Sequence, residues 1–120
     1  MLLVVDAANV VGSVPDGWWR DRAGATVRLR DRLAPLATDG LPGLPGPLEV
    51  VLVVEGAARD VAGTPGVRVV VAPGSGDDAI VELVRQEPAD RPRVVVTADR
   101  ALRERVRRLG ATVLGPREVR

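Results

Sequence analysis

The order of apolar and polar positions along the chain predicts strands and helices in alternation. Five short runs of aliphatic residues are continuous rather than alternating, as expected of strands that are covered on both faces of a parallel sheet. These runs occupy residues 2–5, 49–54, 67–71, 93–97 and 111–114. Helical periodicity fills residues 19–37, 77–87 and 99–110 and is weaker over 54–63. Because such alternation implies right-handed crossovers, we predict an α/β fold, a three-layer sandwich with a mostly parallel five-stranded sheet.

One segment interrupts this regularity. Residues 38–47, TDGLPGLPGP, contain too much proline and glycine for a helix, and we predict a surface loop there. Upstream of it, Trp18 lies in phase with an apolar stripe that includes Leu29 and is expected to pack with it. A chain of 120 residues, 46% hydrophobic and 28% charged, fits one folded unit, so we expect residues 1–120 to form a single domain.

The composition excludes several kinds of catalysis. The sequence contains no histidine, cysteine or lysine, and all 17 basic residues are arginine. Without these side chains there is no Ser-His-Asp or Cys-His triad, no Schiff base and no phosphate-binding loop that depends on lysine. Carboxylate, amide, hydroxyl and guanidinium groups remain, and the oxygen donors among them suit hard cations such as Mg²⁺ or Mn²⁺.

Acidic residues follow the predicted strands at one edge of the sheet. Asp6, Glu55 and Asp99 come at or just after the end of an apolar run, and Asp77 and Asp78 open the helix after the third run. Ligands of open α/β sheets bind beyond the carboxyl ends of the strands, so all five carboxylates are expected to face one place. The simpler interpretation is that Asp77, Asp78 and Asp99 cap helices, that Asp6 and Asn9 stabilise a turn, and that Glu55 has no special role. Gathered carboxylates repel one another unless a cation lies among them, and we therefore predict a metal site at this edge.

Four segments resemble the NYN domains, which are relatives of the PIN-type nucleases. VVDAANVVGSVPD (4–16) is similar to their first strand with its Asp-x-x-Asn motif, and VVEGAAR (53–59) resembles the end of their second strand. GSGDDAIVE (74–82) and VVVTADRALRERVRRLGATVLGP (94–116) are similar to their later acidic motifs. The similarity runs through nearly the whole chain in the right order. It departs from the family pattern at Glu55, where aspartate is more usual, and at Ala98, which replaces a serine.

The resemblance implies a PIN-like fold and a Mg²⁺- or Mn²⁺-dependent ribonuclease that acts on RNA. Carried over by position, Asp6, Asp77 and Asp99 would bind metal, and Asn9 would position a water or the scissile phosphate as part of the catalytic set. Glu55 and Asp78 are further candidates for metal binding. The longer side chain of Glu55 would reach the metal through water, and the motif aligns better on Asp77 than on Asp78.

Candidate RNA-binding residues lie beside this motif. Net charge is only +1, so no overall field attracts nucleic acid. Arg100 and Arg103 lie on the arginine-rich helix after Asp99, where they would contact phosphate oxygens, or they belong to an ordinary solvated helix face. Trp19 is the better candidate of the two tryptophans for stacking on unpaired bases.

Other function classes stay open at this stage. The main alternative is a catalytically inactive NYN-type module that binds RNA or protein. A receiver-like or phosphatase-like domain is disfavoured, because the first lacks its lysine and the second its second aspartate, where Ala8 stands. A homodimer and a toxin-like role with an antitoxin or other protein partner are compatible with the sequence. No apolar run is long enough for a membrane span, and we expect a cytoplasmic protein.

Overall fold

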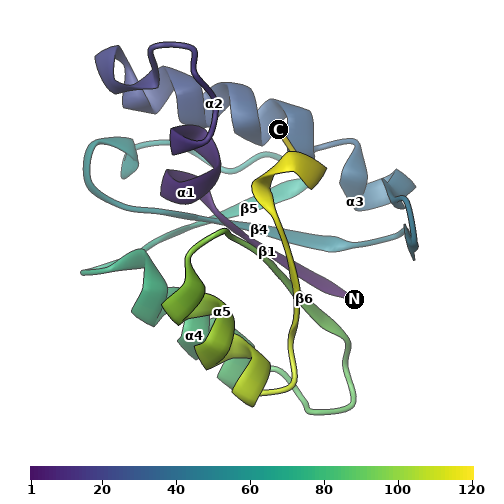
Figure 1. Ribbon diagram of the computed structural model, residues 1–120. Coiled ribbons are helices and arrows are strands. Elements are labelled where there is room, and N and C mark those ends of the chain that lie inside the picture. The colour runs from purple at the N-terminus through teal and green to yellow at the C-terminus, as the bar shows by residue number, and fades with distance from the viewer.

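Five parallel strands form one sheet in the computed structural model, which describes residues 1–120 (Figure 1). The sheet has the order β5-β4-β1-β6-β7. Its strands are β1 (Leu2–Asp6), β4 (Glu49–Val54), β5 (Val67–Val71), β6 (Arg93–Val96) and β7 (Thr112–Leu114). All five predicted strands are confirmed, as is the α/β sandwich with its parallel sheet.

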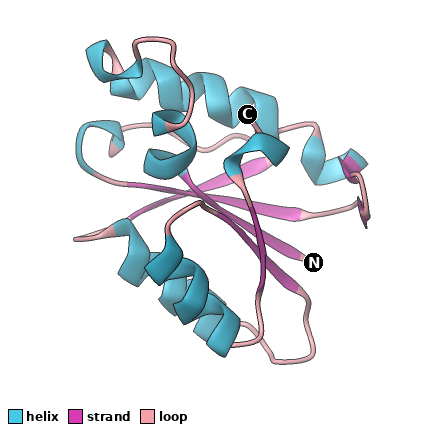
Figure 2. Cartoon of the chain, in the orientation of Figure 1, coloured by secondary structure: helices cyan, strands magenta, loops and turns pink.

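Helices cover both faces of this sheet (Figure 2). The helices α1 (Ala7–Gly12), α2 (Arg22–Leu33) and α3 (Leu36–Asp39) lie on one face, and α4 (Gly76–Gln86) and α5 (Arg100–Arg108) lie on the other. Alternate residues of β1 point to opposite layers: Leu3 and Val5 belong to the core beneath α1 and α2, whereas Leu2 and Val4 belong to the core beneath α4 and α5. This double burial explains why the strand sequences are continuously apolar.

The predictions for the segments between the strands need four corrections. Residues that follow Asp6 form the short helix α1 rather than a turn, because the Asp6 side chain caps it by accepting the Asn9 N–H. The stretch 19–37 is divided into a 3₁₀ turn η1 (Trp18–Arg20), α2 and α3. The weak helix at 54–63 is only a 3₁₀ turn η2 (Gly56–Ala58), and a further turn η3 (Pro116–Glu118) follows β7.

The fourth correction concerns the Pro- and Gly-rich segment. Residues 38–47 begin with the end of α3 and continue as a small antiparallel hairpin of β2 (Gly40–Leu41) and β3 (Leu44–Pro45). Gly40 has a positive φ of 72°, and a β-carbon there would meet the backbone of Leu44 and Gly46. Glycine at this position permits the close approach of the two backbones, so a hairpin forms where the composition predicted a loop.

The order in which successive strands are added to the sheet reverses at β1. From β1 the chain builds outward through β4 and β5 on one side and later through β6 and β7 on the other. The loops after β1 and β6 consequently diverge to opposite faces and leave a crevice at the carboxyl ends of the strands. None of the helices combines the length and apolar character that crossing a membrane requires.

Candidate active site

Four carboxylates from four separate segments meet in the crevice beside β1. They line a cavity of about 290 Å³ at the carboxyl edge of the sheet. Its lining residues are Asp6, Ala8, Asn9, Glu55, Asp77 and Asp99. No arginine belongs to this lining, so the cavity concentrates negative charge. We call it the acidic cleft.

Asp6 is the most buried of these acids. It ends β1 at the centre of the sheet and is only 7% exposed. The Thr97 hydroxyl donates a hydrogen bond to its Oδ2 at 3.0 Å, and the Asn9 N–H donates to its Oδ1 at 3.4 Å. Burial raises the pKa of Asp6 from 3.8 to about 6, although the Thr97 hydrogen bond opposes this rise. The negative charges of Asp77 and Glu55 add to it.

Thr97 joins two acids and was not predicted as a site residue. This fully buried hydroxyl donates to Asp6 and accepts the backbone N–H of Asp99 at 3.2 Å. The only signal in the sequence was a hydroxyl residue at the end of an apolar strand, two positions before an acid.

Asn9 connects α1 to the loop that carries Asp99. Its Oδ1 accepts the backbone N–H of Ala98 at 2.8 Å, and its Nδ2 donors have no protein partner. The Asp-x-x-Asn spacing thus places both side chains in one cavity, one turn of α1 apart.

Asp99 and Glu55 each use one carboxylate oxygen to accept a backbone N–H at the start of a helix. Asp99 caps α5 by accepting the Leu102 N–H at 3.0 Å, and Glu55 accepts the Gly76 N–H at the start of α4. A β-carbon at Gly76 would lie 3.0 Å from the Glu55 carboxylate, so glycine permits this approach. The capping interpretation of Asp99 is correct, whereas Ser75 rather than Asp77 or Asp78 caps α4. The second oxygen of Asp99 and of Glu55 has no protein donor.

Asp77 and Asp78 are separated by the geometry of α4. Asp77 lines the acidic cleft and makes no hydrogen bond through its side chain, whereas Asp78 lies outside the lining and pairs with Arg105 at 3.0 Å. Burial, followed by the charge of Asp99, raises the pKa of Asp77. The expectation that all five acids share one place therefore holds for four of them, and Asp78 is the exception.

The donor set of the acidic cleft fits a hard divalent cation in its chemistry. As the side chains stand, no three acidic residues are arranged to hold one ion together. Mg²⁺ usually binds through one or two carboxylates, with waters and substrate phosphates completing its coordination. The free oxygens of Asp77, Asp99 and Glu55 are of the type that this mode of binding requires.

The predicted RNA-binding residues lie outside the acidic cleft. Arg100 is exposed at the start of α5, next to Asp99. Arg103 is half-buried and donates its Nε–H to the Thr97 carbonyl at 2.7 Å, so it braces α5 against the end of β6. Trp19 is 58% exposed and meets Trp18 edge to face at a ring separation of 6.0 Å.

The architecture and the carboxylates at its edge define an α/β protein with a PIN-like fold. No family model matches the sequence, and no curated protein matches it. Among solved structures, the chain is similar to a crystal structure of a mutant form of Rae1 (YacP) from Bacillus subtilis. The TM-score is 0.72 at 20% sequence identity, and the match covers 98% of this chain and 70% of that chain. A likeness at this identity establishes the fold and leaves the activity to the argument from the site.

Proposed function

We propose that the protein is a divalent-metal-dependent ribonuclease that hydrolyses RNA phosphodiester bonds at the acidic cleft. The observation that carries this proposal is the meeting of Asp6, Glu55, Asp77 and Asp99 in one cavity without a basic residue. Folding alone does not favour such a cluster, since burial and mutual repulsion raise the pKa of Asp6 and of Asp77. A cation would remove this repulsion. The resemblance to NYN domains and the shared PIN-like fold support the same activity.

Asp6, Asp77 and Asp99 would hold the ion, and Glu55 would reach it through a water molecule. A bound Mg²⁺ or Mn²⁺ supplies Lewis acidity toward water and phosphate oxygens at neutral pH. Metal chemistry is the route to hydrolysis that this composition favours, because the chain contains no histidine, cysteine or lysine.

The protein's own residues would orient the metal-binding carboxylates and the RNA phosphates. Thr97 and the Asn9 N–H hold the Asp6 carboxylate in a fixed orientation at the floor of the cleft. Asp77 has no hydrogen bond to break and turns toward a ligand at little cost. The Nδ2 donors of Asn9 are available to a phosphate oxygen, and Arg100 lies beside Asp99 where a second phosphate of the chain would pass.

Cleavage of an end-labelled single-stranded RNA tests this function. Purified protein is incubated with Mg²⁺, Mn²⁺ or EDTA, and products are resolved by length. We expect cleavage only with metal, and a loss of at least about a hundredfold in Asp77→Asn, as is typical when one electrostatic contributor to a transition state is removed.

Asp78→Asn is the matched control for this experiment. It makes the same chemical change one residue away, at an exposed side chain that pairs with Arg105 outside the cleft. We expect Asp78→Asn to keep its cleavage rate and Asp6→Asn/Asp99→Asn to lose it. Equal rates in Asp77→Asn and Asp78→Asn, or cleavage that survives EDTA, would contradict the proposal. RNA binding without cleavage in every metal would instead favour the inactive binding module.

A further inference from the structure

A second cavity lies beside the acidic cleft. It encloses about 430 Å³ between α1, the start of α2 and the loops that follow β4 and β5. Ala8 and Glu55 belong to the linings of both cavities, so the two are neighbours across these residues. This size lies within the usual range of small-molecule sites, roughly 300–1,000 Å³. We call it the tryptophan cavity after Trp18.

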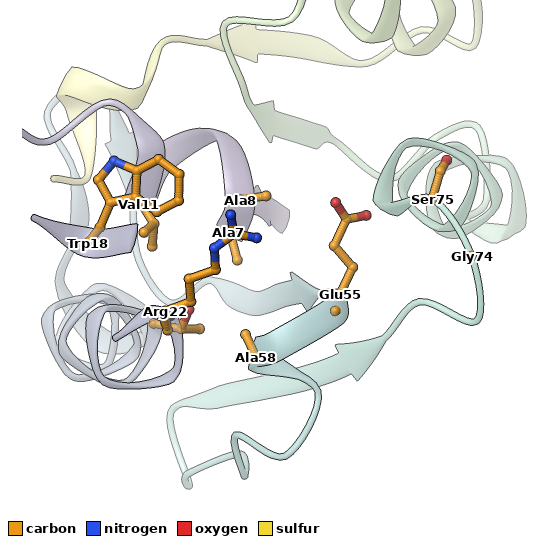
Figure 3. A pocket seen from close by; sticks show the side chains of 11 residues that line it. Ala7, Ala8, Val11, Trp18, Arg22, Glu55, Ala58, Gly74 and Ser75 are labelled. Carbon is orange, nitrogen blue, oxygen red and sulfur yellow. Dashed lines mark hydrogen bonds between the residues drawn. The ribbon is translucent and has the colours of Figure 1, made fainter. Parts of the chain in front are cut away.

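One wall of the tryptophan cavity combines an indole and a guanidinium. The Arg22 Cζ lies 5.2 Å from the centroid of the Trp18 ring, which is a cation–π distance. Figure 3 shows both side chains on one side of the cavity and Glu55 across from them on the other side. The Arg22 guanidinium makes no hydrogen bond or ion pair with the protein, so its donors and the face turned away from Trp18 are available to a ligand.

The opposite wall offers an acceptor. Only one oxygen of Glu55 is occupied by the Gly76 N–H, and the other has no protein donor. The floor between the walls is apolar, with Ala7, Val11 and Ala58 buried beneath it. A planar group with an apolar face, acceptors on one edge and an N–H on another matches these three surfaces.

We propose that the tryptophan cavity binds a base of single-stranded RNA adjacent to the phosphodiester in the acidic cleft. Bases stack on aromatic rings and on guanidinium planes, and their edges carry both the acceptors and the N–H donors that Arg22 and Glu55 would meet. The shared residues Ala8 and Glu55 place the bound base directly beside the acidic cleft. This inference rests on the proposed function, because its ligand is the chain that the acidic cleft cleaves.

Tryptophan fluorescence reports on this cavity directly. The chain has two tryptophans and no tyrosine, so Trp19→Phe leaves Trp18 as the sole fluorophore. This protein is titrated in EDTA with the four ribonucleosides, and with ribose as the control that lacks a base, with excitation at the red edge of indole absorption. Nucleosides carry no phosphate, so the acidic cleft does not repel them. We expect saturable quenching by nucleosides and none by ribose.

Two arginine variants of the same helix test the assigned wall. Arg22→Gln in the Trp19→Phe protein is expected to weaken nucleoside binding at least about tenfold, because it removes the stacking plane. Arg28→Gln is the control: Arg28 is exposed on α2 outside the cavity, 3.9 Å from Asp16, and its loss should leave binding unchanged.

The nucleoside titration tests the base site independently of the nuclease activity. Quenching that rises linearly without saturation, equals that of ribose, or is the same in Arg22→Gln overturns the base site even if metal-dependent cleavage is intact. Saturable quenching that depends on Arg22 supports it. If that result accompanies a protein that never cleaves RNA, the base site stands and the ribonuclease proposal fails.

Discussion

In Asp99 and Glu55, the structural role and the proposed chemical role fall on different oxygens of one carboxylate. Asp99, which lines the acidic cleft, accepts the Leu102 N–H through Oδ1 as the cap of α5, and its other oxygen has no protein donor. Asp6 uses both oxygens within the protein, toward Thr97 and Asn9. The two roles can therefore be separated at Asp99 by the choice of substitution.

Asp99→Asn and Asp99→Ala should differ in stability but share a loss of cleavage. Asparagine caps helices about as well as aspartate, whereas alanine leaves the Leu102 N–H without its acceptor and costs about 1 kcal/mol. Urea unfolding should therefore find Asp99→Asn close to the unmodified protein and Asp99→Ala less stable. Retention of full metal-dependent cleavage by Asp99→Asn would show that its charge has no part in the reaction.

The buried Asp6 should make the metal-free protein less stable as pH rises. Its pKa is about 6 when folded against 3.8 as the ordinary value, so the folded state holds the proton more tightly. The stability from this group is full below about pH 4 and is lost as pH rises through 6, a loss of about 3 kcal/mol at most.

Urea unfolding in EDTA across this pH range measures the effect of Asp6. Asp6→Asn should lose the decline in unfolding free energy between about pH 4 and pH 7. Asp90→Asn removes an exposed acid remote from the cleft and should keep the decline. An unchanged slope in Asp6→Asn would mean that other carboxyl groups account for it.

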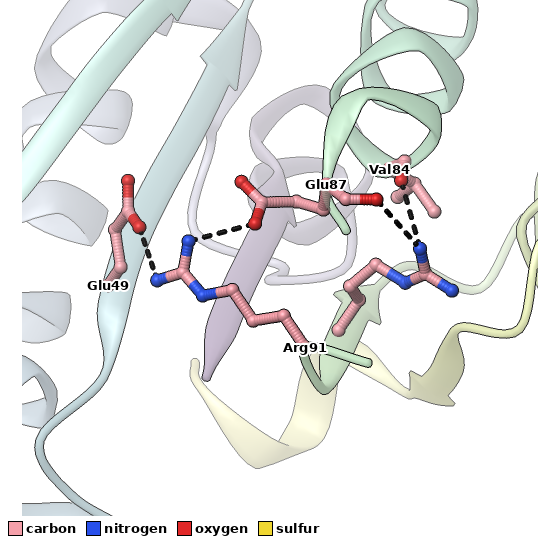
Figure 4. A network of polar contacts seen from close by, with 5 residues as sticks. Glu49, Val84, Glu87 and Arg91 are labelled. Carbon is pink, nitrogen blue, oxygen red and sulfur yellow. Dashed lines mark hydrogen bonds and ion pairs between the residues drawn. The ribbon is translucent and has the colours of Figure 1, made fainter. Parts of the chain in front are cut away.

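At the scale of elements, one buried arginine joins the carboxyl ends of two helices. Arg93, 8% exposed in β6, donates to the carbonyls of Val84 and Glu87 at the end of α4 and of Leu109 at the end of α5. Figure 4 shows the half-buried Arg91 nearby, between the carboxylates of Glu49 and Glu87. A cation at two helix carboxyl ends is favoured by both helix dipoles.

Arg93→Met and Arg91→Met should therefore differ in their cost. Loss of Arg93 leaves buried carbonyls without donors at two helix ends, and we expect the unfolding free energy to fall by about 3 kcal/mol. Loss of Arg91 removes surface ion pairs, which are worth about 0–1 kcal/mol each. Thermal or urea unfolding of the two variants makes the comparison, and similar costs would contradict the bracing role of Arg93.

Across the whole molecule, the acidic cleft exists only because distant parts of the chain converge on β1. Asp6 and Thr97 are 91 positions apart in the sequence and are hydrogen bonded, and Glu55 reaches Gly76 across 21 positions. Any ligand of the cleft therefore contacts segments that separate when the fold opens. Binding to the folded state alone should stabilise the entire protein.

Mg²⁺ or Mn²⁺ should accordingly raise the unfolding temperature in a saturable way. A free ion at a hundred times its Kd adds about 2.7 kcal/mol to the unfolding free energy, or a shift of several degrees for a domain of this size. Differential scanning fluorimetry with metal and with EDTA measures it. Asp6→Asn should abolish the shift and Asp90→Asn should retain it; a shift of equal size in both variants would place the ion elsewhere.

The sequence by itself determined the strands and the edge of the sheet at which the acidic residues lie. Continuous aliphatic runs are stable only where both faces are covered, so the five strands and their parallel sheet were readable from residues 2–5, 49–54, 67–71, 93–97 and 111–114. Parallel strands present their carboxyl ends at one edge, and this rule alone predicted that Asp6, Glu55 and Asp99 would lie near one another.

Tertiary structure decided which polar groups face the cleft and which support the fold. Successive residues of a helix point about 100° apart, so Asp77 and Asp78, equivalent as letters, separate into a cleft residue and a surface ion pair. In the same way, Arg103 was a candidate for RNA binding by sequence, but its Nε–H donates to the Thr97 carbonyl within the protein. Periodicity reports burial against one face, but partners such as Thr97 for Asp6 or Arg22 for Trp18 depend on contacts between elements that no local pattern specifies.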